Sequence, residues 1–199
     1  MEILGKLFGS PHRVRILRLF LLNPEKVLDR ADIARRSKVP ERDVKKELTM
    51  LAEINFIRQK AKVADEDGEK VREGKKGWQL NPAFPIIKPL KLLLLHTVPF
   101  SRDEIARRLR GVGKMKLIVT AGIFIQDENS RTDLLLVGDE IKKAALDSAI
   151  RTMEAEIGRE LNYGVFETED FHYRFGVYDK FIRDVLDYPH EKILDKLGL

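Results

Sequence analysis

The 199-residue sequence contains no cysteine, which excludes disulfide bridges and thiolate metal sites. It also lacks any run of 18 apolar residues, the four leucines at 92–95 being its longest candidate. The N-terminus shows no signal-peptide pattern. These absences predict a soluble, cytoplasmic protein that does not enter a membrane.

Residues for common catalytic chemistry are also sparse. The four histidines lie far apart, and none has the H-E-x-x-H or H-x-x-E-H spacing of zinc enzymes. No G-x-S-x-G motif occurs, and Ser130 has no base partner visible in the sequence. We therefore expect no metal ion, no cofactor and no serine nucleophile.

The net charge of +5 is unevenly distributed along the chain. Residues 1–82 hold 19 Lys and Arg against 13 Asp and Glu, whereas residues 83–199 hold 18 against 19. A DNA-reading module joined to a neutral domain has this asymmetry. The alternative is a chance clustering of charge in a Lys-rich protein.

Three helices are predicted in the basic segment. Apolar residues recur at the helical period over residues 10–22, over a short stretch after the N-cap Asp29, and from Pro40 or Glu41 to about residue 55. The turn between the second and third helices is short, and basic side chains line the outer face of the second. This arrangement predicts a helix-turn-helix.

A β-hairpin is predicted directly after the third helix. Residues 56–63 alternate as a strand with a basic solvent face, residues 65–77 are polar and interrupted by glycine, and residues 77–81 form a short return strand. A hairpin in this place is a wing. Residues 6–82 resemble the winged helix-turn-helix of ArsR-like and MarR-like bacterial regulators.

The resemblance implies that the third helix enters the major groove of double-stranded DNA. Arg42 and Lys45 are then placed to bond guanine edges, while Lys46 and the basic residues of the second helix meet phosphates. The alternative for each single lysine is a solvated surface residue, and winged helices also dock proteins. The full set of predicted DNA contacts is Arg35, Arg36, Glu41, Arg42, Lys45, Lys46, Thr49, Lys70, Arg72, Lys75 and Lys76.

A linker is predicted over residues 83–100. The prolines at 82 and 85 interrupt the preceding strand, and residues 86–96 are apolar at helical spacing. An apolar helix must be covered. It packs in the core of its own subunit, bridges the two domains, or forms a dimer seam.

The remaining segment, residues 101–199, is predicted to alternate helices and strands. A helix capped by Ser101 is followed by a strand at 116–124, a strand that includes residues 131 and 133 and runs to 137, a helix at 139–160, a strand at 162–166 and helices that begin at Thr168 and Tyr178. Gly111-Val112-Gly113-Lys114 is a weak phosphate-loop candidate, because a strand rather than a helix follows it.

This order resembles the minimal nucleotidyltransferase domain, as do the stretches at 133–139 and 154–163. The whole chain is therefore predicted to be α+β, with a winged helix-turn-helix at 1–82 and a small α/β domain with a mixed sheet at 101–199.

In the nucleotidyltransferase family, a Gly-Ser turn ends one strand, and the two carboxylates of a D-x-D pair that opens the next strand hold magnesium. Here Gly122 is followed by Ile123, and the pair reads Arg131 and Asp133, which we expect on one strand face. Arginine offers no lone pair to a metal. The strand at 161–166, where the family's third carboxylate usually sits, has no acid. The resemblance therefore implies a domain without transferase activity.

Two interpretations of the remaining polar residues stay open. Gly122, Ser130, Arg131 and Asp133 form a degenerate pocket that senses a nucleotide phosphate, or Asp133 is only a capping or turn residue.

The prediction for function is a DNA-binding transcriptional regulator that acts as a homodimer, with the second domain used for dimerisation or for sensing a nucleotide or other small molecule. The alternatives are an active nucleotidyltransferase carried to nucleic acid by the winged helix, and an antitoxin-like interaction protein.

Overall fold

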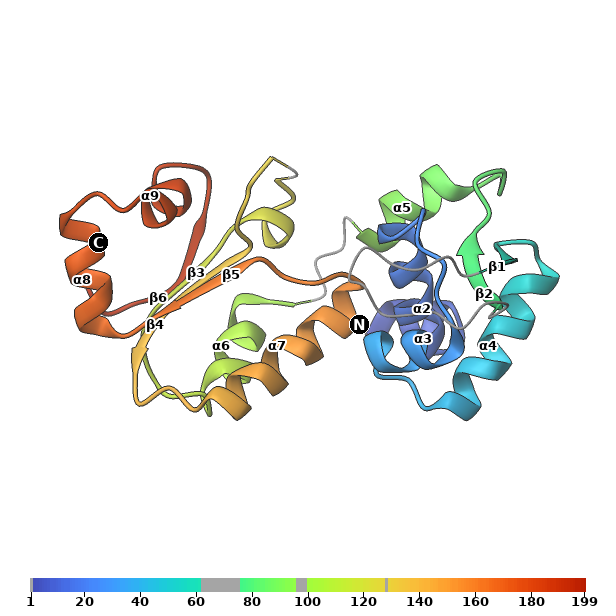
Figure 1. Cartoon of the computed structure of the whole chain (residues 1–199), viewed down its shortest axis with the longest axis horizontal. Coiled ribbons are helices and arrows are strands. Elements are labelled where there is room, and N and C mark those ends of the chain that lie inside the picture. Colours follow the sequence, from blue (N-terminus) through green and yellow to red (C-terminus); the bar gives the residue numbers. More distant parts are fainter. Residues whose placement is uncertain (1, 62–75, 96–99, 128) are drawn as a thin grey trace. The chain divides into compact units, whose positions relative to one another are not determined.

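The computed structural model describes residues 2–61, 76–95, 100–127 and 129–199, and it divides the chain into two compact units (Figure 1). The first unit is Met1–Thr97 with Thr152–Arg159, and the second is Val98–Arg151 with Glu160–Leu199. Both units mix helices and strands, so the α+β prediction is confirmed. The predicted boundaries differ, because residues 83–97 and 152–159 belong to the first unit.

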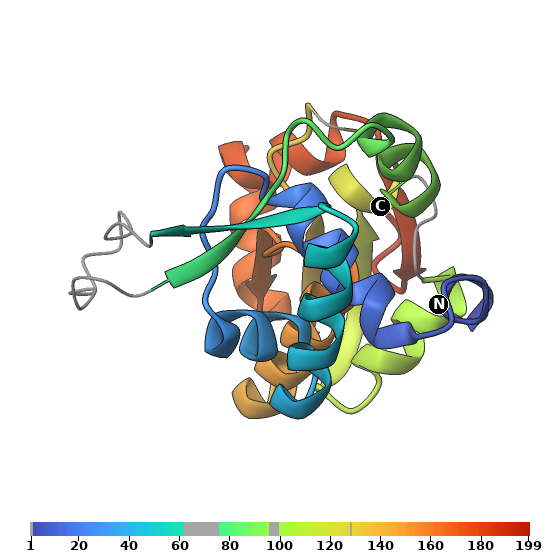
Figure 2. The ribbon, with the colours of Figure 1, turned by 90° about the vertical axis from the view of Figure 1, so that its right-hand side faces the viewer.

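The first unit consists of helices and one β-hairpin. The strands β1 and β2 are antiparallel, with Ile57 opposite Leu80, and Leu28 adds a single antiparallel bridge to Trp78. The hairpin extends away from the helices of its unit (Figure 2). Its elements are α1 (Glu2–Leu7), α2 (Pro11–Leu22), α3 (Arg30–Ser37), α4 (Glu41–Glu53), β1 (Ile57–Ala61), β2 (Lys76–Leu80) and α5 (Ile87–Leu95).

Side-chain caps determine where two of these helices begin. The Ser10 hydroxyl accepts the N–H of Arg13 at 3.2 Å, which satisfies a donor at the start of α2. Asp29 and Asp32 form a reciprocal capping box at the start of α3. Lys38, in the left-handed region at φ 50°, ends α3 and starts the short turn to α4. The predicted starts of these two helices are confirmed.

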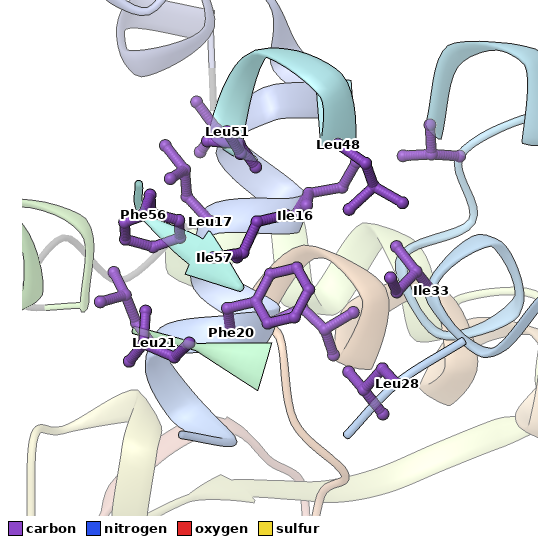
Figure 3. Packing of buried hydrophobic residues seen from close by; sticks show 14 of the residues in the cluster. Ile16, Leu17, Phe20, Leu21, Leu28, Ile33, Leu48, Leu51, Phe56 and Ile57 are labelled. Atoms are coloured by element: carbon purple, nitrogen blue, oxygen red, sulfur yellow. The ribbon is translucent and has the colours of Figure 1, made fainter. Parts of the chain in front are cut away.

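The core of the first unit lies between α2, α3, α4 and the hairpin (Figure 3). Helical spacing puts Ile16, Leu17, Phe20 and Leu21 of α2 on its buried face. The other buried members of this core include Leu28, Ile33, Val44, Leu48, Leu51, Phe56, Ile57 and Leu80.

The helix α5 divides its apolar residues between the core and the surface. Leu94 is fully buried, and Leu90 is one of the partly buried residues that pack against the core. Leu92 and Leu93 are 66% and 43% exposed. Core packing within one subunit is therefore confirmed for one face of this helix, while Leu92 and Leu93 stay exposed.

The segment 152–159 completes the first unit through a buried arginine. The Arg18 side chain on α2 is 1% exposed, and its guanidinium donates to the carbonyl oxygens of Leu94 at 2.8 Å and Glu156 at 3.0 Å. A Cβ on Gly158 would lie 2.7 Å from the Arg18 carbonyl carbon, so glycine alone allows this backbone approach. These contacts explain why the first unit is discontinuous in sequence.

The second unit is built on a four-stranded mixed sheet of order β5-β4-β3-β6. The central strand β3 is antiparallel to β4 and β6, whereas β4 is parallel to β5. The mixed sheet is therefore as predicted. Its elements are α6 (Arg102–Leu109), β3 (Lys114–Thr120), a 3-10 turn η1 (Gly122–Phe124), β4 (Leu134–Asp139), α7 (Lys143–Ile157), β5 (Tyr163–Phe166), α8 (Thr168–Gly176), α9 (Lys180–Leu186) and β6 (Glu191–Asp195).

Helices cover both faces of this sheet (Figure 1). Alternate residues of β3 and β4 point to α8 and α9 and form a core of Leu117, Val119, Leu135, Val137, Phe171, Ile182 and Val185. The helix α6 and the first part of α7 lie on the opposite face (Figure 1). No helix within the described ranges is both long and apolar enough to cross a membrane.

Three features of the second unit differ from the sequence prediction. The strand predicted to reach residue 124 ends at Thr120, because Gly122 has φ +51° and turns the chain into η1. The helix predicted at 139–160 begins only at Lys143, since β4 continues to Asp139. The strand β6 was not predicted, and neither was α1 in the first unit.

Candidate nucleic-acid interface and nucleotide pocket

The helix α4 separates buried from exposed residues cleanly. Val44, Glu47, Leu48 and Leu51 are buried against the core. The five residues that were predicted to face DNA are all exposed: Glu41, Arg42, Lys45, Lys46 and Thr49. The helix therefore presents one polar face with three cations.

An ion pair holds α4 against α2. The Arg13 Nε donates to the Glu47 carboxylate at 2.8 Å, and its Nη1 donates to the Phe8 carbonyl oxygen at 2.8 Å. Glu47 is 5% exposed, so its charge is compensated in the interior rather than by water. Sequence reasoning did not select Glu47. The available signal was an acid at a position where the helical period of Val44, Leu48 and Leu51 predicts burial.

The cations on this face differ in how far they are neutralised. Arg42 is 87% exposed and lies 3.7 Å from Asp43, which is also 3.5 Å from His12. Lys45 and Lys46 form no side-chain ion pair within the described part of the chain. No ion pair within the described residues therefore neutralises these two lysines.

The two arginines predicted on α3 have different environments. Arg35 is exposed and pairs with Asp32 at 3.0 Å. Arg36 is half-buried, and its Nη2 donates to the side-chain oxygen of Asn23 at 3.4 Å. The prediction that both point away from the protein is wrong for Arg36, because a hydrogen bond draws its head towards α2.

The hairpin adds exposed cations that the predicted set lacks. Arg58 and Lys60 lie two residues apart on β1, hence on one face of the strand, and both are exposed. Lys76 of β2 is exposed as predicted. The predicted contacts Lys70, Arg72 and Lys75 lie outside the described residues.

The pocket residue Asp133 is a buried structural acceptor. It is 1% exposed, and its two carboxylate oxygens accept the backbone N–H groups of Ile123 at 3.0 Å and Asn162 at 2.9 Å. A carboxylate in this position joins η1 to the residues just before β5. The interpretation of Asp133 as a turn residue is the one that this geometry favours.

The other three pocket residues differ in how they lie relative to Asp133. Gly122 lies against it, since a Cβ there would come within 2.4 Å of the Asp133 Oδ1. The Ser130 hydroxyl donates to the Thr132 carbonyl oxygen at 2.7 Å. Arg131 is exposed. The prediction that residues 131 and 133 share a strand face is wrong, because β4 begins only at Leu134 and both residues precede it.

We predict that Arg131→Asp does not create a magnesium site. Asp133 is buried and both of its oxygens already accept hydrogen bonds, so a new carboxylate at 131 has no partner for a shared cation. Isothermal titration with magnesium chloride should give the same heats for the variant and the wild type. Saturable binding of one ion by the variant alone would contradict this account of Asp133.

Within the described residues, no three His, Cys, Asp or Glu side chains gather as a possible metal site. The candidate sites are therefore the polar face of α4 and the exposed cations of the hairpin. The Asp133 carboxylate already accepts two backbone hydrogen bonds. Comparisons with protein-family models, with curated proteins and with solved structures found no match.

Proposed function

We propose that the protein is a DNA-binding transcriptional regulator in which the first unit is a winged helix-turn-helix. The order α2, bridge, α3, α4, β1 and β2 supports this assignment, with a short turn between α3 and α4 and a hairpin directly after α4. The observation that carries the proposal is the face of α4, which exposes Arg42, Lys45 and Lys46 while its apolar face and Glu47 are buried. Such a helix suits the major groove.

The roles of the cations follow from their side chains. Arginine at position 42 and lysine at position 45 suit the acceptors on guanine edges, and Glu41 suits the amino group of cytosine. Lys46, Arg58 and Lys60 suit the neutralisation of phosphates, because they are exposed cations on neighbouring elements of the same unit.

Duplex binding and its salt dependence test this proposal. Each phosphate contact releases condensed counterions, so Lys46→Ala should make the slope of log K against log salt shallower by about one. Fluorescence anisotropy with labelled duplexes measures the slope. Lys26→Ala, which removes an exposed lysine between α2 and α3, serves as the control. Absence of duplex retention by the wild type at low salt would contradict the proposal.

For the second unit we propose a fold that resembles the minimal nucleotidyltransferase domain but does not transfer nucleotides. Its succession of helix, two antiparallel strands, helix, parallel strand and helices supports the resemblance. The Asp133 carboxylate accepts hydrogen bonds from the backbone N–H groups of Ile123 and Asn162. These bonds support the absence of nucleotidyl transfer, because a carboxylate that accepts two backbone donors has less capacity to bind magnesium. Incubation with labelled nucleotide and magnesium should leave the protein and added nucleic acid unlabelled.

We also propose that the protein acts as a homodimer, since two copies gain affinity from two half-sites. The exposed Leu92 and Leu93 of α5 support a contact between copies, because large apolar side chains gathered on one helix are uncommon on monomer surfaces. Sedimentation equilibrium tests this: a single species of 23.0 kDa at micromolar concentration would exclude it.

A protein-interaction role is the second candidate, and the tyrosines of the second unit favour it. Tyr173, Tyr178 and Tyr188 are 70%, 73% and 63% exposed on and after α8 and α9. Tyrosine is enriched at protein interfaces. The Arg183 guanidinium lies 5.4 Å from the Tyr178 ring centroid. A partner that binds here without any duplex binding by α4 would make this the primary function.

A further inference from the structure

A second group of cations lies in the second unit, at the end of the sheet where α6 stops and α7 starts (Figure 1). Arg107 and Arg110 are three residues apart, and both have helical backbone geometry. Lys142 and Lys143 stand at the beginning of α7. All four residues are exposed, and we call them the α6–α7 basic surface.

Backbone contacts hold the two halves of this surface together. The Lys142 N–H donates to the Val112 carbonyl oxygen at 2.7 Å. A Cβ on Gly113 would lie 2.8 Å from the Asp139 carbonyl oxygen, so a larger residue would separate the two segments. The glycine-rich stretch that resembled a weak phosphate loop is therefore a close-packing turn that positions these cations.

Two of the acids at this end of the sheet are already engaged. Glu140 forms an ion pair with Lys114. Asp139 accepts the Thr168 N–H at 3.3 Å, and hydrogen bonding by Thr168 lowers the pKa of the Asp139 carboxyl. The α6–α7 basic surface itself forms no side-chain hydrogen bond or ion pair within the residues that the structure describes. None of the four cations is therefore neutralised by a direct ion pair within the described residues.

We propose that the α6–α7 basic surface binds the phosphate backbone of duplex DNA, so that the second unit adds affinity to the sequence-reading contacts of α4. This rests on the proposed function of the first unit. Arginine and lysine on exposed helix ends bind phosphates without reading sequence. A lipid surface fits less well, because no large apolar side chain is exposed among the described residues from 100 to 151.

The test is a salt titration of duplex binding by the full-length chain. The probe is a fluorescein-labelled DNA duplex of mixed sequence, several helical turns long, titrated at a series of sodium chloride concentrations. For Lys142→Ala/Lys143→Ala we expect a slope shallower by about two and an affinity on the order of tenfold weaker at moderate salt. Both lysines are exposed, so the variant should fold normally.

A matched control removes the same charge elsewhere on the second unit. Lys180 and Lys196 are also exposed, and Lys180→Ala/Lys196→Ala should leave the slope unchanged. Equal slopes for Lys142→Ala/Lys143→Ala and the wild type would overturn the inference. An equal loss in the control pair would do the same, because the effect would then come from net charge alone. Binding of anionic lipid vesicles, but not of duplex, through Lys142 and Lys143 would replace DNA by a membrane surface.

The same titration separates this inference from the function proposed for the first unit. Lys45→Ala/Lys46→Ala should also make the slope shallower by about two. If only this pair changes the slope, α4 binds DNA and the α6–α7 basic surface does not. If only Lys142→Ala/Lys143→Ala changes it, the basic surface binds DNA and the role proposed for α4 is wrong.

Discussion

Asp133→Ala is expected to destabilise the protein by about 3–5 kcal/mol, although the position resembles that of a metal-binding carboxylate. The carboxylate is buried and accepts the N–H groups of Ile123 and Asn162. Alanine leaves both donors without an acceptor in the interior, and each lost hydrogen bond to a charged group contributes about 1.5–3 kcal/mol. Equilibrium urea denaturation followed by circular dichroism should show a midpoint about 2 M lower.

Two comparisons make this result specific. Asp127, in the same loop, is half-buried and accepts the Asn129 N–H at 2.9 Å, so Asp127→Ala should cost less than about 1 kcal/mol. Asp133→Asn keeps the side-chain volume and one acceptor oxygen. Its loss of stability should therefore lie between those of Asp127→Ala and Asp133→Ala. If Asp133 were instead a functional carboxylate held at the expense of stability, Asp133→Ala would be as stable as the wild type or more stable.

Arg18→Ala should destabilise the first unit by about 3–5 kcal/mol. Burial lowers the pKa of Arg18 to about 10, while the charge of Glu156 raises it, so the side chain stays protonated at neutral pH. Removing it leaves the carbonyl oxygens of Leu94 and Glu156 without this donor and takes one positive charge away from the buried Glu156 carboxylate. Trp78, the only tryptophan, lies on β2 of the same unit and reports its unfolding by fluorescence.

Arg15→Ala is the matched control for this variant. Arg15 lies on the same helix, pairs with the same Glu156 at 3.5 Å, and has a side chain that is 23% exposed. We expect Arg15→Ala to lower the free energy of unfolding by about 1 kcal/mol, because water solvates the charge of a partly exposed side chain. Arg18→Met keeps most of the side-chain volume, so its loss of stability should lie between those of Arg15→Ala and Arg18→Ala. Equal midpoints for Arg18→Ala and Arg15→Ala would show that the buried hydrogen bonds do not anchor residues 152–159.

The sequence predicted the helices of the first unit well because their signals are local. The period of Ile16, Leu17 and Phe20 and the caps Ser10 and Asp29 all lie within a few residues of the elements that they define. The exposed face of α4 followed from the same period. Geometry along one helix is thus sufficient to place its outward side chains.

Features that depend on distant partners escaped prediction. Arg18 reads as one polar residue in an apolar stripe, and its carbonyl partners lie 76 and 138 residues further along the chain. The strand β6 is short and pairs with β3, about 70 residues earlier. Neither α1 nor β6 has enough residues to show a clear period.

The prediction that residues 131 and 133 share a strand face failed for a different reason. Placing residues 131 and 133 in a strand assumed that side chains alternate there. Hydrogen bonds from Ser130 to Thr132 and from Ile123 and Asn162 to Asp133 instead hold a loop, and alternation begins at Leu134. Such side-chain bonds compete with strand pairing and leave no periodic trace in the sequence.

Because residues 152–159 belong to the first unit, the ribosome must synthesise most of the chain before that unit is complete. Residues 98–151 emerge in between, which takes roughly 3–10 s at typical elongation rates. During this interval the α2 backbone at Arg18 and Leu19 lacks its contact with Gly158, and the helices of the first unit lack their last packing element. The first unit therefore completes its folding only after much of the second unit has been synthesised. We expect a polypeptide that ends before residue 159 to be bound by chaperones and cleaved by proteases.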